Sequence, residues 1–139
     1  MQLGKHIIVD MFNVNLDKLH NINCDSEKKE KWAYFMNECF KNANINCLNT
    51  SWNDFNNNGA FTVLYLLSES HLSIHTWPEH NYIALDVFTC GDSNTQYVVN
   101  ELVKYFEPTD KKIINLSRGN LSYPNYVKEL ENDTLFLLC

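Results

Sequence analysis

Three strand-like segments follow one another closely in the middle of the chain, and this succession limits the folds open to it. Residues 61–67 (FTVLYLL) are almost entirely apolar, as in a central strand covered on at least one face. Residues 71–77 (HLSIHTW) alternate between apolar and polar side chains, and residues 82–90 (YIALDVFTC) form a third segment. Because only a few residues separate these segments, they connect as hairpins, and we expect a largely antiparallel sheet.

The flanking regions add three further strands and two helices. Strands are expected at residues 4–13, 45–52 and 111–116, and a polar, asparagine-rich loop at residues 53–59. Asp25 or Ser26 can cap a helix whose apolar positions repeat at i, i+3, i+4, i+7, i+8 and i+11: Trp32, Phe35, Met36, Cys39, Phe40 and Ala43. Ser93 is expected to cap a second helix, with Val98, Val99, Leu102, Val103 and Phe106 on its buried side.

The resulting order, β-α-β-β-β-β-α-β, predicts an α+β fold. We expect a two-layer sandwich in which a largely antiparallel sheet carries two helices on one face. The other face of the sheet then needs cover, which suggests a partner subunit. A length of 139 residues fits one domain, residues 1–139.

Composition argues against several classes of protein. The net charge is −6 and the sequence has no basic cluster, so nucleic-acid binding through phosphate contacts is not expected. No apolar run approaches the roughly 20 residues of a membrane helix, and the N-terminus lacks a signal-peptide pattern, so we expect a cytoplasmic protein without a membrane partner. The five cysteines are widely spaced and form no CxxC pair, unlike a zinc site or a disulfide framework. An acidic surface fits a cationic small-molecule ligand.

Residues 68–79 (SESHLSIHTWPE) are the most unusual segment, with two histidines, several hydroxyls and two carboxylates. On a helix, His71 and His75 would form an i, i+4 metal pair. On the strand that the alternation favours, they share a face but lie about 13 Å apart. A serine hydrolase would need a GxSxG nucleophile elbow, which the sequence lacks. The segment could also hold ordinary polar side chains of a sheet surface, and the chemistry alone leaves these alternatives open.

Several segments together resemble one family. SESHLSIHTWPE followed by ALDVFTCG is similar to the processing and active-site signature of bacterial-type S-adenosylmethionine decarboxylases, the pyruvoyl-dependent enzymes of polyamine synthesis. LGKHIIVDMF resembles the first strand of that family, and Ser117-Arg118-Gly119 resembles the ending of its last strand. The resemblance runs from Leu3 to about Gly119, and the contiguous central block makes it specific.

The resemblance implies a proenzyme that cleaves itself. Ser70 would attack the carbonyl of Glu69 and convert the amide to an ester; elimination and loss of ammonia would then leave a pyruvoyl group at residue 70. Residues 1–69 would become the beta chain and residues 70–139 the alpha chain. His75 matches the family's proton donor in processing, and Ser68 and Thr62 are candidates for assisting it.

The resemblance also implies how the processed enzyme works. The pyruvoyl ketone would form a Schiff base with the amine of S-adenosylmethionine and accept the electrons released with carbon dioxide, giving the aminopropyl donor for spermidine synthesis. Cys90 matches the proton donor in decarboxylation, and Phe55 and Glu79 match substrate-binding residues, Phe55 by stacking on adenine. Neither pyridoxal phosphate nor a metal is implied. The family assembles as homodimers of processed protomers, with active sites where subunits meet.

Residues 53–62 depart from the family's loop pattern, H-x-F-x-P-x-G-V-S-G. Asn53 stands for the histidine, the proline is absent, and either Thr62 or Phe61 takes the place of the serine, depending on the alignment. A changed loop beside an intact catalytic block is what a change of substrate would give. Pyruvoyl-dependent decarboxylation of arginine or ornithine is therefore an alternative, and an unprocessed regulatory pseudoenzyme is another. Net charge does not choose among the substrates, because all of them are cationic.

Overall fold

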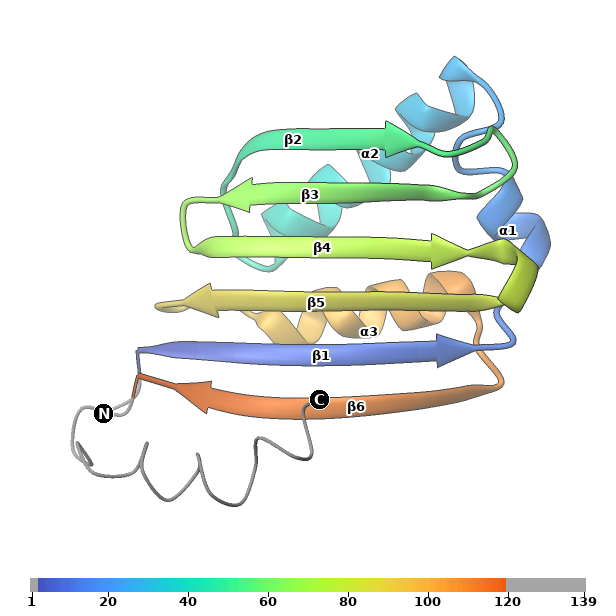
Figure 1. Ribbon diagram of the computed structural model, residues 1–139. Helices are drawn as coiled ribbons and strands as arrows, with labels where there is room; N and C mark the ends of the chain where they lie inside the picture. The colour runs from blue at the N-terminus through green and yellow to red at the C-terminus, as the bar shows by residue number, and fades with distance from the viewer. Residues whose placement is uncertain (1–2, 120–139) are drawn as a thin grey trace.

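The computed structural model describes residues 3–119 of the chain. Within them, six strands form one sheet in the order β2-β3-β4-β5-β1-β6, and all neighbouring strands are antiparallel (Figure 1). The strands are β1 (Gly4–Phe12), β2 (Cys47–Asp54), β3 (Phe61–Leu67), β4 (Ser70–Trp77), β5 (Tyr82–Cys90) and β6 (Asp110–Arg118). The helices are α1 (Leu16–His20), α2 (Ser26–Asn42) and α3 (Thr95–Phe106), with a 3-10 turn η1 (Pro78–His80). None of the described helices is long and apolar enough to cross a membrane.

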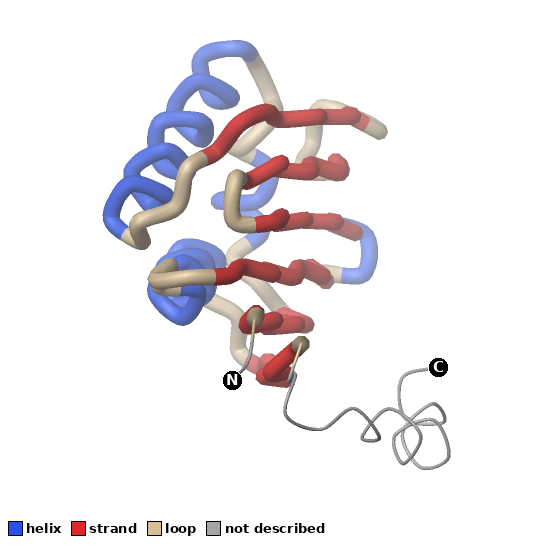
Figure 2. The backbone as a smooth tube through the Cα atoms, turned by 90° about the vertical axis from the view of Figure 1, so that its left-hand side faces the viewer, coloured by secondary structure: helices blue, strands red, loops and turns tan. Residues whose placement is uncertain are grey.

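Both long helices cover the same face of the sheet (Figure 2), which confirms the predicted two-layer α+β sandwich. The strands alternate, so every second side chain points toward the helices; on β1 these are Ile7, Val9 and Met11. They form one core cluster with residues of the two helices, among them Trp32, Met36, Phe40, Val98, Val99, Leu102 and Phe106. Burying one such side chain contributes about 1.5–3 kcal/mol, so this layer holds the helices on the sheet.

The opposite face of the sheet is covered by none of the described helices, and we call it the uncovered face (Figure 2). Large apolar side chains on it remain partly exposed: Phe12, Leu64, Leu66 and Trp77. The ring of Tyr82 lies between those of Phe12 and Trp77, with 5.3 Å between neighbouring centroids. The uncovered face therefore presents apolar and aromatic side chains.

Capping residues set the helix boundaries, and one of them differs from the prediction. Asp25, one of the two residues expected, caps α2 by accepting a hydrogen bond from the backbone three residues on. Asn94 caps α3 in the same way, and the predicted cap Ser93 is wrong. Ser93 lies buried before the helix, where its hydroxyl donates to two backbone carbonyls. The sequence analysis missed the short helix α1, which Asn15 caps.

The strands lie close to their predicted positions. β3 and β5 match residues 61–67 and 82–90, and β6 continues to Arg118. β2 begins two residues later than expected, because Ile45 still closes the end of α2, where its N–H donates to the carbonyl of Phe40 at 2.8 Å. Asn53 and Asp54 were expected in the loop but belong to β2, since they pair with β3. The chain beyond residue 119, whose fold the sequence did not predict, lies outside the described residues.

Candidate active site

The predicted cleavage site lies in the tight turn between β3 and β4. Leu67 pairs with Ser70, so only Ser68 and Glu69 form the loop. Two-residue hairpins favour type I′ or II′ turns, which need a positive φ inside the loop. Neither loop residue has one, and Ser70 instead has a φ of +148°. A non-glycine residue in such a conformation costs about 1–3 kcal/mol, so backbone strain is located at Ser70, directly after the Glu69–Ser70 peptide bond.

The carbonyl group of Glu69 meets a hydrogen-bond donor. The backbone N–H of Cys90, at the end of β5, donates to the Glu69 carbonyl oxygen at 3.1 Å. A donor in this position polarises the carbonyl carbon and stabilises negative charge on the oxygen when a nucleophile attacks. Cys90 is exposed, and together with Ser68 and Glu69 it lines a cleft of about 430 Å³.

The side chain of Glu69 is fixed as well. Its carboxylate accepts hydrogen bonds from the N–H of Asn46 at 2.6 Å and from the hydroxyl of Ser68 at 2.8 Å. The N–H of Ser68 donates to the carbonyl of Asn46 at 2.9 Å, so both loop residues are bound to the segment that leads into β2. The sequence analysis did not find Asn46, which takes part only through its backbone. We call Ser68, Glu69, Ser70 and Cys90 the cleavage group.

Two other predicted residues meet on neighbouring strands. Thr62 on β3 pairs with His75 on β4, and Thr62 Oγ1 lies 3.1 Å from His75 Nδ1. Phe61, in contrast, is fully buried in the core. Of the two residues that could stand for the family's serine, the one beside the histidine is therefore Thr62.

Phe55 and Glu79 lie at the same end of the sheet as this pair. Phe55 begins the loop after β2 with its side chain 69% exposed, and Glu79 is exposed in η1. The loop is held by the buried Asn23, whose side chain donates to Asp54 Oδ1 at 2.9 Å and accepts from the N–H of Gly59 at 2.8 Å. The sequence analysis missed Asn23 because it lies 36 positions from the glycine that it contacts.

The predicted site residues thus fall into two groups at opposite ends of the strands (Figure 1). The cleavage group lies at the β3–β4 turn; the other group, which we call the histidine group, consists of Phe55, Thr62, His75 and Glu79. Ser70 and His75 are five residues apart on β4, which at the usual rise per residue is about 17 Å. Within one chain, His75 is too far from the Glu69–Ser70 bond to exchange a proton with it.

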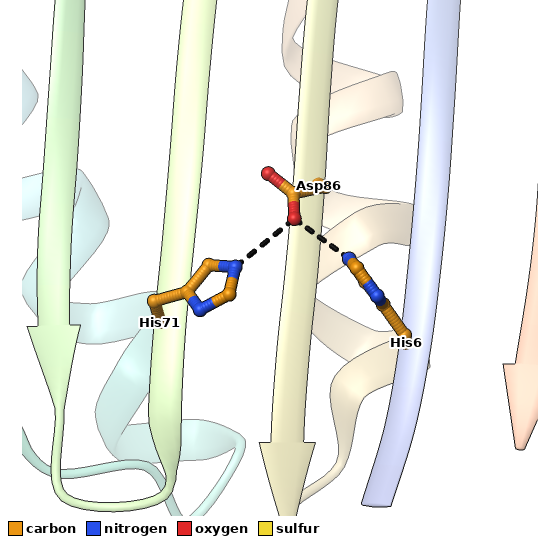
Figure 3. A group of neighbouring side chains, drawn as sticks. All are labelled: His6, His71 and Asp86. Atoms are coloured by element: carbon orange, nitrogen blue, oxygen red, sulfur yellow. Dashed lines mark hydrogen bonds and ion pairs between the residues drawn. The ribbon is translucent and has the colours of Figure 1, made fainter. Parts of the chain in front are cut away.

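A third cluster lies on the uncovered face beside the cleavage group (Figure 3). Asp86 Oδ2 lies 2.7 Å from His6 Nε2 and 3.1 Å from His71 Nε2, and the hydroxyl of Ser73 donates to the other carboxylate oxygen. Burial alone would raise the pKa of Asp86, but the hydrogen bonds from Ser73, His6 and His71 outweigh it and hold the pKa below its usual value. Asp86 is therefore a carboxylate at neutral pH.

This cluster is the place where the described residues could share a metal ion. One ligand atom from each of His6, His71 and Asp86 lies within 4.8 Å of the other two. The pair considered from the sequence, His71 and His75, does not come together, because both lie on one strand. His6 and Asp86 escaped the sequence analysis, although the alternation of β1 and β5 puts them on the face of His71.

Comparison with known proteins points to one family. A sequence model of the family described as S-adenosylmethionine decarboxylase matches residues 5–119. The S-adenosylmethionine decarboxylase proenzyme of Sulfurihydrogenibium sp. is 38% identical over 114 residues, which are 80% of this chain and 80% of that protein. The proenzyme of Persephonella marina is 36% identical over 139 residues, 96% of this chain and 97% of that protein. The crystal structure of the adenosylmethionine decarboxylase from Aquifex aeolicus has a TM-score of 0.72 at 30% identity, covering 86% of this chain and 93% of that one.

Proposed function

The chain belongs to the S-adenosylmethionine decarboxylase family, whose enzymes use a self-derived pyruvoyl group, and we propose that it decarboxylates S-adenosylmethionine after cutting itself between Glu69 and Ser70. As a member of this family it is a carboxy-lyase proenzyme that supplies spermidine synthesis. The observation that carries the proposal is the strained backbone of Ser70 next to the Glu69 carbonyl, which already accepts a hydrogen bond from the N–H of Cys90.

The chain's own residues account for each bond change of the cleavage. Ser70 Oγ attacks the carbonyl carbon of Glu69 and its proton passes to the amide nitrogen of Ser70, so the peptide C–N bond breaks as the ester C–O bond forms. Relief of the strain at Ser70 favours this step, and the N–H of Cys90 stabilises the oxyanion. Loss of the α-proton of residue 70 then expels the Glu69 carboxylate. The resulting dehydroalanine takes up water and releases ammonia to become the pyruvoyl group, which heads the chain 70–139.

Cys90 is the residue to which we assign the proton transfer of the decarboxylation. The pyruvoyl group supplies a ketone that binds the substrate amine and takes up the electrons released with carbon dioxide. The α-carbon then needs a proton. Cys90 is exposed at the end of β5 and adjoins residue 69 through its backbone hydrogen bond. The other hydroxyl of the cleavage group, that of Ser68, is engaged with the Glu69 carboxylate, so the thiol serves as the general acid.

The histidine group acts, in this proposal, on the cleavage group of a second copy of the chain. His75 lies about 17 Å from Ser70 of its own chain, so a site made within one copy lacks its proton-transferring ring. Both groups border the uncovered face, whose exposed apolar residues Leu64 and Leu66 favour burial against another surface. In a two-fold homodimer across this face, each copy gives its histidine group to the other, and two equal sites result.

The histidine group also supports the assignment of the substrate. Phe55 offers an exposed ring on which adenine can stack, worth about 1 kcal/mol, and Glu79 offers an exposed carboxylate for the ribose hydroxyls or an amine. The pyruvoyl group made from Ser70 is the prosthetic group of this proposal, without pyridoxal phosphate or a metal. A reduced thiol at Cys90 requires a reducing compartment, so we place the enzyme in the cytoplasm.

Denaturing intact-mass spectrometry tests the proposal. The protein should give two fragments that divide between residues 69 and 70, the second with a pyruvoyl start, and Ser70→Ala should give one inactive chain. Ser51→Ala, at an exposed serine of β2, is the matched control and should be cleaved like the wild type. Release of carbon dioxide from S-adenosylmethionine, arginine and ornithine then identifies the substrate. An uncleaved wild-type chain would support a regulatory protein instead.

A further inference from the structure

Four side chains form a continuous row across the uncovered face, one on each of four neighbouring strands. Arg118 Nη1 on β6 lies 3.4 Å from His6 Nδ1 on β1, and His6 contacts Asp86 on β5. Asp86 contacts His71 on β4. We call these four residues the polar row. It ends on His71, which directly follows Ser70, the first residue after the bond that the proposed function cuts.

The hydrogen bonds of the polar row have a defined direction. An arginine side chain only donates, so His6 Nδ1 accepts, and the proton of the neutral ring lies on Nε2, from which His6 donates to Asp86. His71 Nε2 donates to the same carboxylate oxygen. The guanidinium carbon of Arg118 lies 4.3 Å from the centre of the Phe88 ring, which fixes the other end of the row.

The donors and acceptors of these hydrogen bonds argue against a metal ion held by His6, Asp86 and His71. His6 could bind a metal through Nε2 only with its proton on Nδ1, where the Arg118 donor already lies. Hydrogen bonds therefore account for the arrangement of His6, Asp86 and His71. These hydrogen bonds fix the position of His71, the member of the polar row that is next to Ser70 of the cleavage group.

Cleavage changes what holds the start of β4. In the uncut chain, the two-residue loop fixes Ser70 opposite Leu67 on β3. After the cut, residue 70 is a chain end that carries the reactive group, and the pairing with β5 begins only at His71, opposite Phe88. Chain ends fray unless they are anchored, and a displacement of about 1 Å at a reacting atom can cost 100-fold in rate. The first side-chain hydrogen bond beyond the cut that could prevent this is the one between His71 and Asp86.

We propose that Asp86 is a positioning residue that, through His71, holds the new chain end in place after cleavage. The proposal rests on the proposed function, because it needs the cut at Ser70. Asp86 suits this role because it lies on β5, a strand with a neighbour on each side, and because Ser73 and His6 hydrogen-bond to its carboxylate. The carboxylate therefore stays in position while the chain end beside it is formed.

Hydrogen exchange at the start of β4 tests the proposal without using activity. Asp86→Asn keeps the shape of the side chain but replaces the charged acceptor by a weaker, neutral one. In the cleaved protein, we expect this substitution to speed exchange at residues 71–74 several-fold. In the Ser70→Ala background, where the turn is intact, the same substitution should leave exchange there unchanged. Glu107→Gln, at an exposed carboxylate held by Lys18 and Asn15, is the matched control and should change neither protein.

Steady-state kinetics give a second readout. Loss of the anchor should lower kcat by about 10-fold or more with little change in KM, because the proposed substrate contacts of Phe55 and Glu79 are left intact. The side-chain amide of glutamine can still donate to Asp86. His71→Gln should therefore recover part of the kcat that His71→Ala loses.

Several outcomes would overturn the proposal. Equal acceleration of exchange in the cut and uncut proteins would make Asp86 an ordinary structural residue, and unchanged exchange in both would remove it as an anchor. An Asp86→Asn chain that stays uncut would place the residue in processing instead. If Asp86→Asn does not fold, His71→Ala provides the same test, because Asp86 then keeps Ser73 and His6. A wild-type chain that fails to cleave refutes the proposed function itself, which the intact mass shows before any exchange is measured.

Discussion

The backbone N–H of Cys90 donates a 3.1 Å hydrogen bond to the carbonyl oxygen of Glu69. One residue thus contacts the bond that is cut and carries the thiol assigned to the later reaction. The two roles use different atoms, since the first needs the backbone and the second needs the side chain. A change confined to the side chain should therefore separate them.

Cys90→Ala should leave cleavage intact and lower kcat by about 100-fold or more, because a general acid contributes roughly 10²–10⁴ to a rate. The variant keeps the N–H that donates to Glu69. Intact mass gives the cleaved fraction, and release of carbon dioxide gives kcat. Cys24→Ala, at a half-buried cysteine before α2, is the matched control. Equal turnover with and without the Cys90 thiol would remove it from the acid role.

Thr62→Val should slow cleavage by about 5- to 10-fold, because the variant keeps the shape of the side chain but loses the hydroxyl 3.1 Å from His75 Nδ1. A hydrogen bond of this kind contributes about 1 kcal/mol. The measurement is the cleaved fraction as a function of time after synthesis in a cell-free system. Thr62→Ser keeps the hydroxyl and should cleave like the wild type. If the valine and serine variants cleave equally fast, the hydroxyl takes no part in processing.

The strands of the sheet could be predicted because their signals are local, whereas the candidate site residues came from the family resemblance. The apolar run of β3 and the alternation of β4 indicate both strands, and five residues along β4 separate Ser70 from His75. The capping residue of α3 could not be identified from the sequence, because Ser93 and Asn94 are adjacent and both residue types cap helices. Only the hydrogen bond of Asn94 in the folded chain distinguishes them.

The polar row could not be predicted, because it depends on strand order. Arg118 and His6 lie 112 positions apart and meet only because β6 pairs with β1. His6 and Asp86 meet because β1 inserts between β5 and β6. Alternation tells which face each residue occupies, but it does not tell which strands are neighbours.

Phe55→Ala should raise KM for S-adenosylmethionine by about 5-fold, since stacking on adenine contributes about 1 kcal/mol. The side chain is 69% exposed, so its removal should not change the unfolding temperature. KM for any arginine or ornithine turnover should be unaffected, because neither amino acid carries an adenine. Tyr34→Ala removes an equally exposed ring from α2 and is the matched control. The same change in KM for all substrates would argue against stacking at Phe55.

Asp54 should make the loop that carries Phe55 sensitive to acid. Burial acts to raise the pKa of Asp54, but hydrogen bonds from Lys29, Trp52 and Asn23 lower it below its usual value. The folded-state pKa is thus below that of the unfolded chain, so the stabilisation is complete above about pH 4 and is lost as the pH falls through the folded-state pKa. Because the carboxylate is partly exposed, we expect Asp54→Asn to cost about 1 kcal/mol or less at pH 7.

Thermal unfolding of Asp54→Asn and the wild type as a function of pH provides the measurement. The difference in unfolding temperature should shrink as the pH falls toward 2, because the wild-type carboxyl group is then also neutral. Glu30→Gln, at an exposed position of α2, removes the same charge and should show no such trend. A difference that stays constant with pH would mean that the hydrogen bonds of Asp54 do not depend on its charge.

Mixed dimers should reveal whether the site is shared between two copies. Ser70→Ala lacks the nucleophile and His75→Ala lacks the proton-transferring ring, so each variant alone should stay uncleaved and inactive. In a dimer of one copy of each, the intact Ser70 of one chain faces the intact His75 of the other at one site, while the second site has neither. Co-expression should therefore restore cleavage of the His75→Ala chain alone, and activity at one of the two sites.

Differently tagged chains allow intact mass to show which copy is cut. The matched control is co-expression of Ser70→Ala with Cys90→Ala, two changes within the cleavage group. The Cys90→Ala chain should then be cut, but decarboxylation should not rise above the low rate of Cys90→Ala alone, because neither site combines an intact Ser70 with an intact thiol. If His75 served the Ser70 of its own chain, Ser70→Ala and His75→Ala could form no complete site in any dimer, and no cleavage would appear. The separation of about 17 Å along β4 favours the shared site.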